Sequence, residues 1–97
     1  MIIAELSIIT LGATTSQSTT INLVLTTLHK EKNITIYPNA MATVIQAPDL
    51  TTLLTAVHHA HTAVATTGAP RIITTLKIDD RHDKNATVET KLKSISH

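Results

Sequence analysis

The chain has 97 residues, which is the length of one domain, and we predict a single domain over residues 1–97. Its net charge of +1 at pH 7 is too weak for a nucleic-acid-binding protein, and its one aromatic residue, Tyr37, leaves few surfaces on which bases could stack. The absence of Cys excludes disulfides, thiolate metal sites and a cysteine nucleophile.

Alternating apolar residues predict a strand over residues 1–10. One face of this strand is wholly apolar and consists of Ile2, Ala4, Leu6 and Ile8. No positive charge precedes the apolar run, and Glu5 interrupts it, so it does not have the form of a signal peptide. No segment approaches the roughly 20 apolar residues that a membrane span needs. We therefore expect a soluble, cytoplasmic protein with no membrane partner.

The next element is a helix, predicted over residues 19–32 after a loop of small residues over 11–18. Its apolar residues recur at the spacing of one helical stripe: Ile21, Val24, Leu25 and Leu28. Ser18 or Thr19 can cap the start of this helix, and Asn33 is a plausible stop.

Two short strands are predicted next, over residues 34–37 and 41–47, with a turn at Pro38-Asn39 between them. A second helix follows, for which Asp49 is the N-cap and Gly68 the residue just past the end. The apolar face of this helix holds Leu50, Leu53, Leu54, Val57, Ala60, His61 and Val64. A fourth strand is predicted over 71–79.

The order strand, helix, strand, strand, helix, strand predicts an α+β fold of the ferredoxin-like βαββαβ type. Right-handed crossovers give a four-stranded antiparallel sheet with both helices on one face. Residues 80–85 form a charged link, and we expect a short helix over 86–96. One side of that helix carries Val88, Leu92 and Ile95.

The face of the sheet that the helices leave open is predicted to be mixed in character. Its polar residues are Glu5, Ser7, Thr75 and Lys77, and its apolar residues are Ile3, Ile9 and Ile73. This mixture is too apolar for a bare surface and too polar for a dry core. It suits either an interface between two sheets or the floor of a ligand site.

Three histidines in the second helix are the residues closest to a metal-binding pattern. His58 and His61 are three residues apart, but His61 lies on the apolar stripe and His59 points towards solvent. A zinc site needs three or four ligands, and no carboxylate lies one turn away on this helix. We therefore expect a partly buried, hydrogen-bonded His61, two surface histidines and no metal site.

Two further segments could carry chemistry. The run Asp79-Asp80-Arg81-His82-Asp83 could bind a cation or pair across a subunit boundary, although such runs are usually solvated turns. The loop over 11–18 precedes a helix N-terminus and could close over a ligand, but it lacks a phosphate-loop pattern. No nucleophile and base form a recognisable pair, so we predict no catalytic residues, no cofactor and no enzymatic activity.

Several segments of the chain resemble the thiamine-binding protein family. They are Ile3-Ala-Glu-Leu-Ser-Ile-Ile9, Gly12 with its Ser/Thr loop, Met41-Ala-Thr-Val44, Ala60-His61, Arg71-Ile-Ile-Thr-Thr-Leu-Lys-Ile-Asp-Asp-Arg81 and Lys91-Leu-Lys-Ser94. The stretch from Thr74 to Arg81 is the most specific. The resemblance implies a ferredoxin-like fold, dimers that pair into tetramers through their sheets, and binding of thiamine or its hydroxymethylpyrimidine half.

The mixed open face and this resemblance together give a binding hypothesis. The predicted ligand-binding residues are Glu5, Ser7, Asn39, Thr43, Thr75, Lys77 and Asp79. The hydroxyl and amide groups would hydrogen-bond a pyrimidine, and Glu5 or Asp79 would face the thiazolium cation. The alternative is a structural or regulatory interaction module, whose open face serves oligomerisation only.

Overall fold

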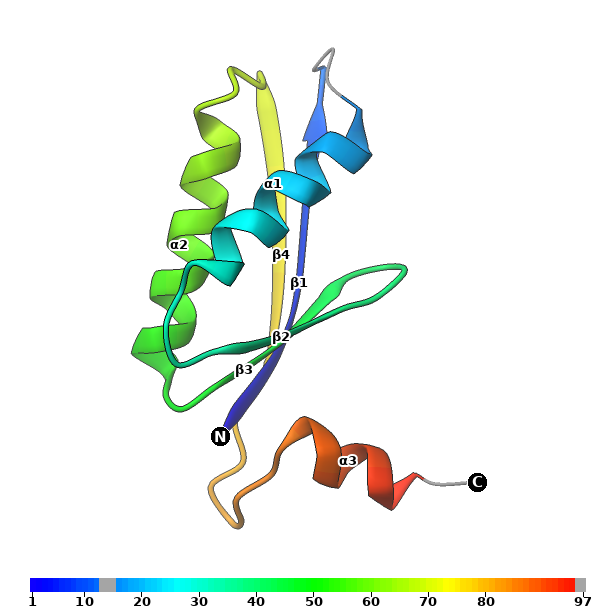
Figure 1. The fold of residues 1–97 in the computed structure, drawn as a ribbon, viewed down its shortest axis with the longest axis vertical. Coiled ribbons are helices and arrows are strands. Elements are labelled where there is room, and N and C mark those ends of the chain that lie inside the picture. The colour runs from blue at the N-terminus through cyan, green and yellow to red at the C-terminus, as the bar shows by residue number, and fades with distance from the viewer. Residues whose placement is uncertain (13–15, 96–97) are drawn as a thin grey trace.

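The computed structural model describes residues 1–12 and 16–95. Its elements are β1 (Ile2–Leu11), α1 (Gln17–His29), β2 (Thr35–Pro38), β3 (Thr43–Ala47), α2 (Leu50–Ala65), β4 (Arg71–Asp79) and α3 (Val88–Ser94). The four strands form one antiparallel sheet in the order β2-β3-β1-β4 (Figure 1). The predicted ferredoxin-like α+β class is confirmed. None of the helices in the described ranges is long and apolar enough to cross a membrane.

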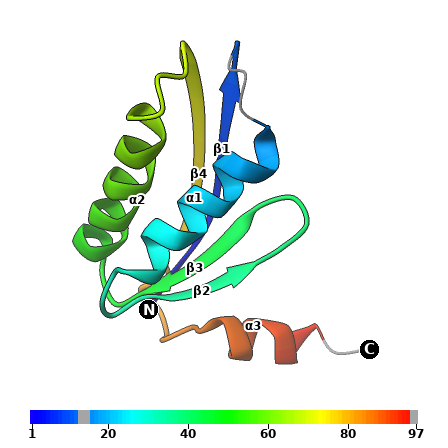
Figure 2. The ribbon, with the colours of Figure 1, turned by 45° about the horizontal axis from the view of Figure 1, so that its top comes forward.

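The alternation in β1 divides the sheet into two faces. Ile2, Ala4, Leu6 and Ile8 are each 5% exposed or less, and they point towards α1 and α2. The intervening residues of β1 lie on the opposite face, because successive side chains of a strand point to opposite sides. Both α1 and α2 cover the first face, so the second face is left open (Figure 2).

The core is built without aromatic rings. It combines the four buried residues of β1 with Ile45 and Ala47 of β3 and with buried side chains from both helices: Val24, Leu28, Leu53, Ala56, Ala60 and Val64. The alanines are small, so α2 can approach the sheet and α1 closely. Aliphatic packing of this kind requires dense interdigitation, since each side chain buries less area than an aromatic residue.

The burial of both helices differs from the predicted stripes. Ile21 is 49% exposed, Leu50 43% and Leu54 45%, although each was expected on a buried face. The rows that face the core are Thr20, Val24 and Leu28 in α1, and Leu53, Ala56, Ala60 and Val64 in α2. Each helix is rotated relative to the predicted stripe, so that Ile21, Leu50 and Leu54 lie at the flank while Leu28 and Leu53 pack in the core.

The ends of the helices depend on side-chain caps. The Asp49 carboxylate accepts a hydrogen bond from the Thr52 N–H at 2.7 Å, as predicted, and this contact lowers the pKa of Asp49 below its usual 3.8. Helix α1 begins earlier than predicted, because Ser16 is its cap and accepts from the Thr19 N–H at 3.3 Å. It also ends earlier, and Asn33 adopts a left-handed φ of 69° in the connection that follows.

The strand β3 is shorter than the predicted 41–47. The Asn39 N–H donates to the Ala42 carbonyl at 3.0 Å, and this turn delays the strand to Thr43. Pairing between β1 and β3 therefore ends at Leu6 and Thr43. Beyond that point the Gln17 side chain takes the place of a strand, since its Nε2 donates to the Thr10 carbonyl at 2.7 Å. The predicted loop 11–18 includes residues 13–15, which lie outside the described residues, as does Ser96 at the end of the predicted last helix.

Candidate functional site

One row of side chains crosses all four strands on the open face. The register pairs Tyr37 with Val44, Val44 with Glu5, and Glu5 with Lys77. The next row joins Thr35, Gln46, Ile3 and Asp79 in the same manner. Side chains directly opposite each other on one face of a sheet lie about 4.5–5.5 Å apart at Cβ. The open face therefore concentrates an aromatic ring, apolar groups and charges of both signs around Glu5.

A recess of about 290 Å³ lies over this part of the sheet. Its side-chain walls come from Ile3, Glu5, Val44, Lys77, Asp79 and Lys91. Two of these residues are apolar, two are acidic and two are basic. The recess is at the lower end of the size range of ligand pockets, roughly 300–1,000 Å³.

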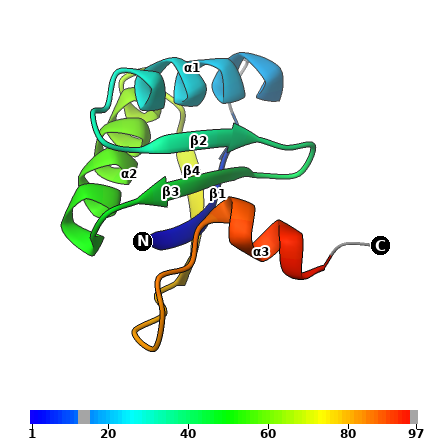
Figure 3. The same cartoon turned by 60° about the horizontal axis from the view of Figure 1, so that its bottom comes forward.

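Helix α3 forms one wall of the recess. It lies on the side of the sheet away from α1 (Figure 3). The Val88 N–H at its start donates to the Gln46 Oε1 at 2.8 Å, and Val88 itself is 9% exposed. Lys91 Nζ then reaches Asp79 Oδ2 at 2.5 Å. These contacts hold the first turn of α3 against the end of the open face.

The structure brings together three of the seven predicted ligand-binding residues. Glu5, Lys77 and Asp79 line the recess. Ser7 and Thr75 pair with each other one row further along the same face. They are accessible from the open side but lie outside the recess.

The other two predicted residues occupy different places. Thr43 pairs with Leu6 and is 8% exposed, so it faces the helices and does not line the recess. Asn39 lies in the turn before β3 and donates to the Tyr37 carbonyl at 3.1 Å. It borders a separate, smaller depression with Ser7 rather than the recess.

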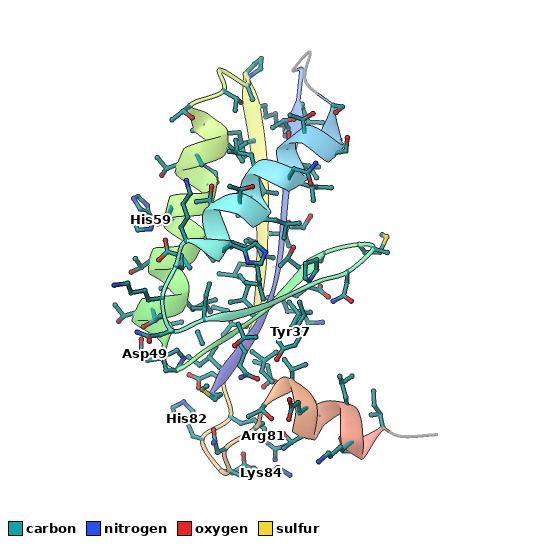
Figure 4. All side chains as sticks on the ribbon, in the orientation of Figure 1. Tyr37, Asp49, His59, Arg81, His82 and Lys84 are labelled. Atoms are coloured by element: carbon teal, nitrogen blue, oxygen red, sulfur yellow. The ribbon has the colours of Figure 1, made fainter. Side chains whose placement is uncertain are left out.

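Three residues of this region were not among the predicted ligand-binding residues: Tyr37, Gln46 and Lys91. Tyr37 is partly buried and lies beside Val44 on the open face (Figure 4). The turn between the second and third strands could have indicated its position, because that turn sets residue 37 opposite residue 44. Lys91 lies at the recess because the charged link turns α3 back towards the sheet, and no sequence pattern in the link indicates that turn.

The sequence comparisons extend over almost the whole chain. Residues 4–96 match the profile of a family described as thiamine-binding protein. The chain belongs to the thiamine-binding protein family. A UPF0045 protein of Methanothermobacter thermautotrophicus is 41% identical over 96 residues, which is 98% of this chain and 96% of that protein. A UPF0045 protein of Methanocaldococcus jannaschii is 38% identical over 94 residues, covering 97% and 91% of the two chains.

Solved structures share the fold of this thiamine-binding protein family member. A crystal structure of a hypothetical protein from Methanocaldococcus jannaschii superposes with a TM-score of 0.86 at 38% identity, covering 97% of this chain and 94% of the other. A Thermotoga maritima protein named for thiamine biosynthesis or salvage superposes with a TM-score of 0.82 at 12% identity, covering 98% of each chain. The second likeness shows a shared fold alone.

The charged link of this family member forms ion pairs within itself. Arg81 holds Asp83 through two hydrogen bonds, of 2.8 and 2.6 Å, and lowers the Asp83 pKa to about 2. Asp80 lies 3.0 Å from His82 and raises the pKa of that imidazole. All these side chains are exposed. The run is thus an exposed turn in the isolated chain, as runs of this kind usually are.

The three histidines of α2 take the positions expected of them. His61 is partly buried and its Nδ1 lies 2.6 Å from the Thr74 hydroxyl, whereas His58 and His59 are exposed. His59 also pairs with Glu31, which joins α2 to the chain just past α1. Within residues 1–12 and 16–95, no three His, Asp or Glu side chains gather in a way that could hold a metal ion.

Proposed function

We propose that the chain is a non-enzymatic binding protein for thiamine or its hydroxymethylpyrimidine half, and that the ligand sits in the recess on the open face. The recess itself is the observation that carries the proposal. It joins apolar walls to a few convergent polar groups, two carboxylates and two lysines, in a concave site, which is the composition of small-molecule pockets. The family's description supports this ligand class.

The residues of the recess suit the two rings of thiamine. The Glu5 carboxylate accepts hydrogen bonds from the exocyclic amine of an aminopyrimidine, and Asp79 faces the cationic thiazolium. Tyr37 provides a ring beside Val44 for offset stacking, which adds about 0.5–1.5 kcal/mol beyond the area buried. Ile3 and Val44 provide apolar surface against which the faces of the thiamine rings can pack.

Isothermal titration with thiamine and with hydroxymethylpyrimidine tests the proposal. We expect saturable binding, and we expect Glu5→Gln to weaken it at least tenfold, or by about 1.4 kcal/mol, because the charge that attracts the ligand is lost while the shape is kept. Glu89→Gln is the matched control, since Glu89 is exposed on α3 and outside the recess. The absence of heat with both compounds on folded protein would overturn the proposal.

We propose further that the protein acts as a homo-oligomer, with a dimer of dimers as the expected form. Apolar side chains on the open face and on α3 support an assembly: Ile9 is 39% exposed, and Leu92 and Ile95 are each 60% exposed. The same exposure favours the alternative function, an interaction module whose open face serves assembly only. Titration separates the two functions, because a pure assembly module binds neither compound.

A further inference from the structure

A second recess lies beside the first, between the charged link and α3. Its volume is about 240 Å³. The polar side chains that line it are Arg81, Lys84, Asn85, Thr90, Lys91 and Ser94. Figure 4 shows Arg81 and Lys84 on the link between β4 and α3. Among the described residues, three cationic side chains therefore line this recess and no carboxylate side chain does, although the whole chain has a net charge of only +1.

The two recesses meet at Lys91, which lines both. The first recess contains two carboxylates, Glu5 and Asp79, opposite Lys77 and the shared Lys91, so it favours a cationic ring once Lys91 turns to the second recess. The second attracts an anion. A ligand that fits both would carry a positive heterocycle at one end and a negative group at the other.

We propose that the second recess binds the phosphate group of the ligand, so that the preferred ligand class is a phosphate monoester of the cationic heterocycle. This inference rests on the proposed function of the first recess. Arg81 offers a planar set of donors that matches two phosphate oxygens, and Lys84 and Lys91 add point charges. The Asn85 amide and the Thr90 and Ser94 hydroxyls border the same space.

The ion pairs of the free protein show why a phosphorylated ligand would bind more tightly than an unphosphorylated one. Lys91 is paired with Asp79, and Arg81 is paired with Asp83. All four side chains are between 39% and 67% exposed, and exposed ion pairs contribute little to stability. A phosphate can therefore recruit Lys91 and Arg81 at low cost. As Lys91 turns to the phosphate, Asp79 becomes available to the cationic ring.

A ligand without phosphate does not draw Lys91 away from Asp79. Unphosphorylated thiamine must compete with Lys91 for Asp79 and gives Lys91 no new partner. Inorganic phosphate gives Lys91 a partner but leaves the first recess empty. Each half alone is thus expected to bind more weakly than the joined molecule.

Titration with thiamine monophosphate, thiamine and inorganic phosphate tests this inference, using the full chain at constant ionic strength. We expect thiamine monophosphate to bind about tenfold more tightly than thiamine, because its phosphate forms charge-assisted hydrogen bonds to Arg81, Lys84 and Lys91 that thiamine lacks. We expect added salt to reduce this preference, since exposed charges are screened.

Two variants locate the effect. Lys84→Gln should remove most of the preference for the monophosphate and leave the affinity for thiamine unchanged. Lys91→Gln should also remove the preference, and it should tighten thiamine binding because Asp79 loses its competitor. Lys93→Gln is the matched control, since Lys93 lies on the same helix but lines neither recess.

Three results would overturn the inference. If thiamine binds and the monophosphate binds no more tightly, the phosphate subsite is wrong and the proposed function stands. If the preference persists in both Lys84→Gln and Lys91→Gln, the phosphate lies elsewhere. If inorganic phosphate binds as tightly as the monophosphate while thiamine does not bind, the second recess is an independent anion site and both proposals fail.

Discussion

Two adjacent leucines in α2 show how strongly the position of a residue on its helix decides its contribution to stability. Leu53 is 0% exposed and packs in the core, whereas Leu54 is 45% exposed on the flank of the helix. Both were predicted on the buried face. Only the packed structure separates them, because a rotation of the helix by a fraction of a turn exchanges their surroundings.

The two leucines give a matched test of the core. Leu53→Ala should lower the free energy of unfolding by about 2–5 kcal/mol, because it removes a buried side chain and leaves a cavity. Leu54→Ala should change it by roughly 0.5 kcal/mol or less, since it lies at the surface. Urea unfolding followed by circular dichroism measures both. Equal losses in the two variants would contradict the orientation of α2.

At the scale of elements, boundaries marked by one clear signal were predicted more accurately than boundaries with several candidate signals. The fourth strand was predicted over 71–79 and is observed there, because Pro70 precedes it and side chains alternate between two faces along it. The start of α1 was missed by two residues, since Ser16, Ser18 and Thr19 are all capable caps and sequence does not rank them. The start of β3 was missed because the hydrogen bond from Asn39 to Ala42 extends the turn.

A hydrogen bond from the Gln46 side chain helps to hold helix α3 to the sheet, beside the Lys91–Asp79 ion pair and the burial of Val88. Gln46→Ala removes the acceptor of the Val88 N–H, so we expect faster hydrogen exchange throughout residues 88–94 while the sheet remains protected. Gln46→Glu should keep the helix in place, because a carboxylate also accepts this bond and suits a helix N-terminus. Mass spectrometry of exchanged peptides measures the effect. Unchanged exchange in Gln46→Ala would show that Ala86 and Val88 anchor the helix without Gln46.

At the scale of the whole molecule, the sequence predicted the layers and the open face but not the shape of the site. Alternation alone placed Glu5, Lys77 and Asp79 on the face away from the helices, and all three line the recess. Thr43 was predicted as a ligand-binding residue with no face assigned to it, and its face follows only from the register between β1 and β3. The recess also needs α3, whose path follows from contacts 42 residues apart in sequence.

Assembly is testable with a pair of variants on the two faces. Light scattering coupled to size-exclusion chromatography should give a mass that is a multiple of the 10.4 kDa chain, with four copies expected. Ile9→Glu should reduce that mass, because it places a charge among the exposed apolar residues of the open face. Leu54 is similarly exposed but lies in the helix layer, so Leu54→Glu should leave the mass unchanged. A wild-type mass of one chain would contradict the proposed oligomer.

The lack of other aromatic residues makes Tyr37 a natural optical reporter. The chain contains one Tyr and no Trp or Phe, so all of its intrinsic ultraviolet fluorescence comes from a ring beside the recess. Quenching or enhancement of that emission during a titration would report on this position alone, with no label attached. A Tyr37→Leu variant would lack this emission, so it would serve as the blank for fluorescence measurements on this protein.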